Sequence, residues 1–146
     1  MERREFIKTC GFACLGGTAS AALLQGCASS NYFAQTVLAN NLIAIKKTEF
    51  VKAGKDKTVQ RKYVLVKSEK YNYPICIYKI SEENYSAVLM ECTHKGCELQ
   101  PHADYLGCPC HGSEFTNKGV VQSPPAEQNL QTFKITTDND TIYIQL

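Results

Sequence analysis

The chain has 146 residues, which is enough for one ordinary domain and too few for two. Hydrophobic residues make up 44% and charged residues 21%, a globular composition that argues against intrinsic disorder. The formal net charge is only +2, so a nucleic-acid-binding role has no electrostatic support.

Residues 1–26 are predicted to be an export signal rather than part of the folded domain. Arg3 and Arg4 stand just before residues 6–8, Phe-Ile-Lys, and a weakly apolar run rich in Ala and Gly follows over residues 9–25. This layout resembles a twin-arginine signal, a route that exports proteins already folded around a cofactor. A Sec signal with two chance arginines is the alternative.

The end of this segment, residues 24–27 with the sequence Leu-Gln-Gly-Cys, resembles the cleavage box of bacterial lipoproteins. Processing there would attach lipid to Cys27 and hold the domain on the periplasmic side of a bacterial membrane. The alternative is an uncut anchor, although roughly 17 apolar residues are marginal for a spanning helix. Residues 27–40 are then expected to be a tether and residues 41–146 a domain in an oxidising compartment, where a disulfide can persist.

The domain is predicted to be all-β, because hydrophobic stretches of period two alternate with turn signals and no helical apolar period occurs. The first predicted strands are Leu42–Val51, Thr58–Lys67, Tyr73–Ile80 and Ser86–Glu91. Two hairpins follow, one joining Glu114–Phe115 to Val120–Val121 and one joining Gln131–Thr136 to Thr141–Gln145.

Charge is distributed unevenly along the chain. Residues 46–70 hold nine basic side chains against three acidic ones, whereas residues 71–146 hold four basic against nine acidic, a net charge of −5. An ordinary solvated surface of mixed charge would explain this. A functional explanation is steering of the acidic part towards a basic redox partner such as a cytochrome.

Two short segments combine Cys and His. Residues 91–97 have the sequence Glu-Cys-Thr-His-Lys-Gly-Cys and, ten residues further on, residues 108–113 have the sequence Cys-Pro-Cys-His-Gly-Ser. A structural zinc site usually pairs like ligands, C-x2-4-C with H-x3-5-H, and would leave two of these cysteines unused. A pure disulfide framework leaves the histidines idle, and a nucleophilic Cys–His pair needs no duplicated set.

The two segments resemble the two boxes of the Rieske iron–sulfur family, C-T-H-x-G-C and C-P-C-H-G-S, at every fixed position. The resemblance implies an antiparallel β sandwich or barrel with a small cluster-binding subdomain of two loops, at about residues 91–126. It also implies one [2Fe-2S] cluster, with a disulfide between Cys97 and Cys110 in the members that have one. By position, the cluster ligands would be Cys92 and Cys108 on one iron and His94 and His111 on the other.

Histidine ligation changes the charge of such a cluster. Two ferric ions, two sulfides and two thiolates sum to zero because neutral imidazoles add no charge, whereas a four-thiolate cluster carries −2. The family's potentials therefore lie at roughly −150 to +300 mV, against about −400 mV for plant-type ferredoxins. The resemblance further implies that a proton is exchanged together with the electron at His94 or His111.

Residues around the ligands are expected to tune the potential. Gly112 and Ser113 close the second box, and Ser113 matches the hydroxyl that donates a hydrogen bond to a bridging sulfide in the family. Phe115 stands where high-potential members have Tyr, and Lys95 stands where quinol-oxidising members have Leu. Both differences predict a lower potential than that of quinol-oxidising subunits. Residues 123–126, Ser-Pro-Pro-Ala, resemble the proline-rich loop that covers the cluster in the family.

A Rieske oxygenase is excluded by counting, because its second iron needs two further histidines and only His102, expected at the surface, remains. We therefore expect a membrane-tethered redox subunit or carrier that is not an enzyme by itself and has no identified small-molecule substrate. Its donor would be a quinol complex or a molybdenum-type oxidase, and its acceptor a cytochrome-like protein. The alternatives are the Rieske subunit of a quinol–cytochrome oxidoreductase and, from another class, a structural zinc-binding module.

Overall fold

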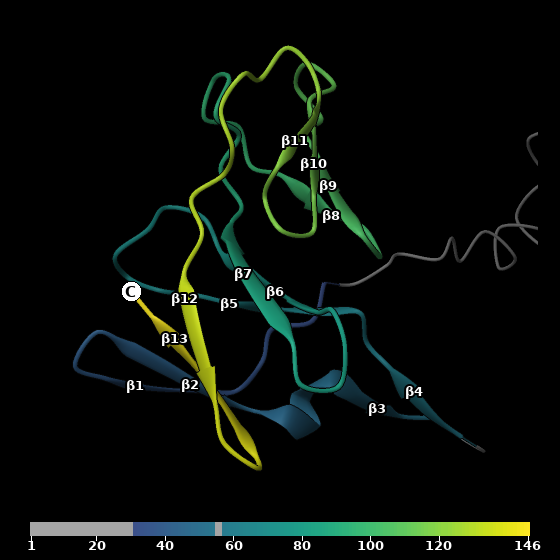
Figure 1. Ribbon diagram of the computed structural model, residues 1–146, viewed down its shortest axis with the longest axis vertical. Coiled ribbons are helices and arrows are strands. Elements are labelled where there is room, and N and C mark those ends of the chain that lie inside the picture. Colours follow the sequence, from purple (N-terminus) through teal and green to yellow (C-terminus); the bar gives the residue numbers. More distant parts are fainter. Residues whose placement is uncertain (1–30, 55–56) are drawn as a thin grey trace, which may run out of the picture. The chain divides into compact units, whose positions relative to one another are not determined.

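The computed structural model describes residues 31–54 and 57–146, and strands dominate them (Figure 1). The predicted signal and Cys27 lie outside the described residues. In the part of the chain that is described, no helix is long and apolar enough to cross a membrane. The elements are β1 (Thr36–Ala39), β2 (Leu42–Lys46), the 3-10 helix η3 (Lys47–Phe50), β3 (Val51–Ala53), β4 (Thr58–Gln60), β5 (Tyr63–Val66), β6 (Ile75–Lys79), β7 (Tyr85–Leu89), β8 (Gln100–Pro101), β9 (Tyr105–Gly107), β10 (Glu114–Thr116), β11 (Val121–Ser123), β12 (Lys134–Thr137) and β13 (Thr141–Gln145).

Two antiparallel sheets, with strand orders β1-β2-β13-β12 and β5-β6-β7, enclose a first hydrophobic core. In the first sheet Ile43 and Ile45 of β2 lie opposite Ile144 and Ile142 of β13, and all four side chains are buried. Alternation of side chains along each strand brings these isoleucines to one face. The second sheet contributes Val64, Val66, Ile75, Ile77, Ala87 and Leu89 to the same core.

The β5-β6-β7 sheet is buried on both faces, because the alternate residues of its strands enter a second core. Cys76 and Tyr78 of β6 are fully buried there, together with Leu106 of β9 and Phe115 of β10. The hydroxyl of Tyr78 donates a hydrogen bond of 2.8 Å to the backbone oxygen of Tyr105. The central sheet therefore supports the small sheet of order β11-β10-β9-β8, which carries the Cys and His loops.

The all-β prediction is confirmed, but the strand predicted over Leu42–Val51 is interrupted by η3. If the strand continued, Lys47 and Glu49 would follow Ile45 into the core and Phe50 would face outwards. The 3-10 turn shifts this phase, so that Phe50 is 1% exposed and its ring lies 5.4 Å from that of Tyr85. A period-two pattern alone gives no sign of such a shift.

The strand predicted over Thr58–Lys67 is likewise divided, into β4 and β5, because the two halves belong to different sheets. Arg61 lies at the break. Its backbone N–H donates to the oxygen of Phe50, and its guanidinium donates to the backbone oxygens of Glu49 and Val51. These bonds fix the base of the β3–β4 hairpin.

The folded region begins earlier than the predicted domain start at residue 41. β1 lies within residues 27–40, the predicted tether, and pairs along its whole length with β2. Upstream of β1, Phe33 bridges to Leu65, and the N–H of Ala34 donates to the oxygen of Leu65. The structure therefore has a paired strand within residues 31–40, which the prediction assigned to the tether. All four side chains of β1 are exposed, so the strand has no buried apolar face that a period-two pattern could reveal.

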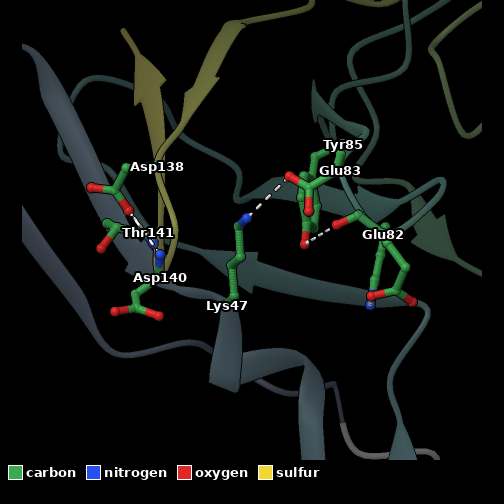
Figure 2. A network of polar contacts seen from close by, with 8 residues as sticks. Lys47, Glu82, Glu83, Tyr85, Asp138, Asp140 and Thr141 are labelled. Carbon is green, nitrogen blue, oxygen red and sulfur yellow. Dashed lines mark hydrogen bonds and ion pairs between the residues drawn. The ribbon is translucent and has the colours of Figure 1, made fainter.

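A polar network joins the turns of the two sandwich sheets (Figure 2). The backbone N–H of Lys47 donates to the oxygen of Asp140 at 2.8 Å, and its ammonium lies 3.4 Å from a carboxylate oxygen of Glu83. The Asp138 carboxylate accepts hydrogen bonds from the N–H groups of Asp140 and Thr141. Asp138 thereby holds the β12–β13 turn closed.

Asp138 is expected to make the stability of the fold depend on pH. The hydrogen bond from the Tyr143 hydroxyl, followed by those from the turn N–H groups, lowers the pKa of Asp138 below its ordinary value of 3.8. A carboxyl with a depressed folded-state pKa stabilises the fold above about pH 4, and this contribution is lost as the pH falls further. We expect Asp138→Asn to lower the melting temperature at neutral pH. The melting temperature of the variant should also decrease less than that of the wild-type protein as the pH is lowered. Asp140→Asn is the control, and an equal effect of both variants would contradict this role.

Candidate metal centre

The first Cys–His segment forms a loop between β7 and β8. The N–H of Cys92 donates to the oxygen of Cys97 at 2.9 Å, and the N–H of Gly96 donates to the oxygen of Cys92 at 2.8 Å. Gly96 has a φ of 72°, a left-handed conformation that a side chain disfavours. The left-handed conformation that the loop requires at this position thus explains the fixed glycine of the box.

The second segment, between β9 and β10, has the same backbone pattern. The N–H of Cys108 donates to the oxygen of Ser113 at 2.8 Å, and the N–H of Gly112 donates to the oxygen of Cys108 at 3.0 Å. Gly112 has a φ of 80°. The two loops are therefore equivalent in backbone bonding, with a buried cysteine beginning each one.

A disulfide between Cys97 and Cys110 joins the loops, in agreement with the pairing that the resemblance implied. The sulfurs of Cys97, Cys108 and Cys110 lie within 4.8 Å of one another. This group cannot itself be a metal site while the disulfide is formed, because only Cys108 then offers a thiolate. The proximity shows instead that the disulfide lies beside the free thiol of Cys108.

The four predicted ligand residues come together at the loops. Cys92 and Cys108 are free thiols, 2% and 4% exposed. The rings of His94 and His111 lie edge to face with centroids 4.9 Å apart. Nδ1 of His94 is buried and has no hydrogen-bond partner among the described residues. Because an unpaired buried nitrogen is costly, this atom fits a metal ligand better than a packing role.

Burial raises the pKa of the Cys92 thiol above its ordinary value, and the neighbouring Cys108 thiol raises it further. The backbone N–H groups of His94 and Lys95 act in the opposite direction by donating hydrogen bonds to the sulfur. Backbone donors aimed at this sulfur favour the thiolate form. Such donors are what a metal-bound cysteine requires in a dry site.

The segment after β11 is fastened to both loops. The Ser113 hydroxyl, fully buried, accepts a 3.0 Å hydrogen bond from the N–H of Ala126, and the Thr93 hydroxyl donates a 2.6 Å hydrogen bond to the oxygen of Gln128. The Ser113 hydroxyl keeps its own proton free to donate elsewhere. The role of Thr93 was not predicted, although its place in the first box could have suggested one.

The remaining predicted residues divide between core and surface. Phe115 is fully buried in the second core, and Lys95 is exposed on the first loop. His102 is exposed and stacks on Tyr105 with ring centroids 4.3 Å apart. The surface prediction for His102 is confirmed.

A family profile described as the Rieske [2Fe-2S] domain matches residues 42–134. The chain therefore belongs to the Rieske [2Fe-2S] family. It is 29% identical over 161 aligned positions to the cytochrome b6-f complex iron-sulfur subunit 1 of Nostoc sp., with 99% of this chain and 84% of that protein covered. It is 27% identical to the cyanobacterial plasma membrane Rieske protein PetC3 from Synechocystis PCC 6803, with a TM-score of 0.53 over 58% of this chain and 87% of that one.

Other relatives match over a shorter part of the chain. The ubiquinol-cytochrome c reductase iron-sulfur subunit of Rickettsia typhi is 40% identical over 55 residues, which are 36% of this chain and 31% of that protein. The chain spans only about a third of the length of several such relatives. Membership of the family implies one [2Fe-2S] cluster, and the free buried thiols and the unpaired His94 nitrogen fit that cofactor.

Proposed function

We propose that this protein transfers single electrons through a [2Fe-2S] cluster, held by Cys92 and Cys108 on one iron and by His94 and His111 on the other. The observation that carries the proposal is the meeting of two buried free thiols and two facing imidazoles on matched loops, with Nδ1 of His94 lacking any protein partner. When bound, the cluster supplies a one-electron couple at a potential raised by its neutral ligands.

The loops would shield the sulfur side and leave the imidazole side accessible. Cys92 and Cys108 are almost fully buried, whereas His111 is exposed and His94 is half-buried. Electron exchange with a partner would therefore occur at the histidine edge. The bonds from Ser113 and Thr93 to the segment after β11 would limit movement of this edge.

Phe115 supports a potential below that of quinol-oxidising members, because its ring cannot donate a hydrogen bond to a ligand sulfur. We expect Phe115→Tyr to raise the midpoint potential, measured by redox titration monitored in the visible spectrum. Phe115→Leu, which adds no hydroxyl, is the control. A potential that Tyr leaves unchanged or lowers would refute this assignment.

Several observations bear on partners and location. Exposed acidic residues surround the motif loops, namely Glu91, Glu98, Asp104, Glu114 and Glu127, and they suit a basic acceptor such as a cytochrome. The donor would be a quinol complex or a molybdenum-type oxidase. Lipid on Cys27 would hold the domain on the periplasmic side of a bacterial membrane, as the Leu-Gln-Gly-Cys sequence suggests.

A second candidate is the Rieske subunit of a quinol–cytochrome oxidoreductase. The near full-length match to a cytochrome b6-f complex subunit favours it. The exposed charge of Lys95 disfavours it, since that position would meet an apolar quinol site in such a complex. A midpoint potential as high as those of quinol-oxidising subunits would decide for this candidate.

The cofactor itself is tested on purified full-length chain produced with iron available. We expect a coloured oxidised protein with acid-labile sulfide, and an EPR signal of one unpaired spin after reduction. A colourless protein with a single bound Zn²⁺ and no sulfide would refute the proposal and establish the zinc-binding alternative.

A further inference from the structure

The β3–β4 hairpin stands apart from both hydrophobic cores. All residues of its two three-residue strands are exposed, and its register places Lys52 opposite Val59. The side chains of Val51 and Val59 are 41% and 57% exposed. A two-stranded hairpin of this length is marginal in water without a covering surface. Because side chains alternate along a strand, Val51 faces the other side of the ribbon, and one face carries Lys52 and Val59 together.

The chemistry of this surface is cationic. Lys52 and Lys57 lie on the hairpin, and Lys62 follows it; all three are exposed, and none forms an ion pair among the described contacts. In the sequence Asp56 stands directly before Lys57 and lies outside the described residues, while three described acidic side chains are engaged by other groups. Glu82 and Glu83 pair with Lys79 and Lys47. The Glu49 carboxylate, in turn, accepts hydrogen bonds from Tyr32 and Gln35.

The start of the described chain lies beside the hairpin. The guanidinium of Arg61, at the hairpin base, lies 3.7 Å from the centre of the Tyr32 ring. The next residue, Phe33, is 41% exposed, and the ammonium of Lys67 lies 4.9 Å above its ring. The first described residues therefore contact a basic side chain at the base of the hairpin.

We propose that the hairpin face that carries Lys52 and Val59, with Lys57 and Lys62 beside it, lies on an anionic lipid bilayer. Lysines beside an exposed valine suit the headgroup region, where the charges meet anionic lipid and Val59 enters the acyl boundary. The inference is independent of the cluster. The inference also predicts how the domain is oriented on the bilayer. The motif loops belong to another sheet, β8 to β11, which is drawn at the top of Figure 1, while the hairpin lies at the lower right.

The first test maps the contact on full-length chain reconstituted in vesicles of phosphatidylcholine, with and without phosphatidylglycerol. Lysine acetylation is followed residue by residue with mass spectrometry. Lys52, Lys57 and Lys62 are expected to react several-fold more slowly on the anionic vesicles, and high salt should remove the protection. Lys118 and Lys134, on other elements, should react equally in all samples. Equal reactivity of the hairpin lysines on both vesicles would overturn the proposal.

The second test reverses charge. Lys52→Glu/Lys57→Glu should weaken the partition of the chain onto anionic vesicles by roughly 30-fold or more relative to Lys118→Glu/Lys134→Glu. Visible absorbance of the same samples reports the cluster, so that failure of the electron-transfer proposal would be seen separately. Equal partition of the two variants would overturn the membrane assignment. Protection of the hairpin lysines without vesicles, rising with protein concentration, would overturn it in favour of self-association.

Discussion

Replacement of Cys108 by serine is expected to give a folded protein that holds essentially no [2Fe-2S] cluster. Cys108 offers a buried free thiol next to that of Cys92, and a serine hydroxyl is a far poorer ligand for iron in such a site. The measurements are iron content, acid-labile sulfide and visible absorbance, with circular dichroism to show that the β fold persists.

The matched control is Cys76→Ala, because Cys76 is also a buried free cysteine but lies on β6 outside the motif loops. Burial raises the pKa of the Cys76 thiol beyond the ordinary range, which makes it an inert part of the core. This variant should keep a full cluster. A Cys108→Ser protein with normal sulfide, or a Cys76→Ala protein that folds without it, would contradict the ligand assignment.

Among the changes proposed, removal of the Cys97–Cys110 disulfide is expected to have the largest effect on the free energy of unfolding. Cys97 and Cys110 are separated by 13 positions, and closure of a loop of about this size stabilises a folded chain by about 3 kcal/mol. We expect Cys97→Ala/Cys110→Ala to lower the free energy of unfolding by about this amount, measured by urea denaturation under oxidising conditions. The variant should also lose its cluster faster, because nothing covalent then joins the two loops.

Thiol reductant provides the internal control for this prediction. It should destabilise the wild-type protein towards the value of the double variant and leave the variant unchanged. Wild-type and variant proteins with the same urea midpoint under oxidising conditions would show that loop bonding, rather than the disulfide, holds the site together.

Local patterns in the sequence predicted the Cys97–Cys110 disulfide and the two loops more successfully than they predicted strand boundaries. The two boxes specify their loops directly, because Gly96 and Gly112 adopt the left-handed conformation that the backbone bonds require. The strands Tyr73–Ile80 and Thr141–Gln145 were predicted well because tertiary packing reinforces their apolar pattern. β1 was missed because its association depends on hydrogen bonds to β2 and not on buried side chains.

Other features depend on contacts between residues far apart in sequence. The bond from Thr93 to Gln128 spans 35 positions, and the unpaired state of His94 Nδ1 depends on everything packed around it. Neither the partner of Thr93 nor the unpaired state of His94 Nδ1 can be inferred from residue type or spacing. The phase shift at η3 belongs to the same class, since it follows from the place of Phe50 in a core built by distant strands.

The doubly covered β5-β6-β7 sheet has a consequence for how the protein can evolve. Apart from Lys79 and Ser86, each of its residues packs in one of two cores, and the core shared with the motif loops contains Cys76, Tyr78 and Val88. A change of volume there would be felt at the loops without touching a ligand. We therefore expect homologous chains to diverge freely at β1, while these three strands accept few replacements.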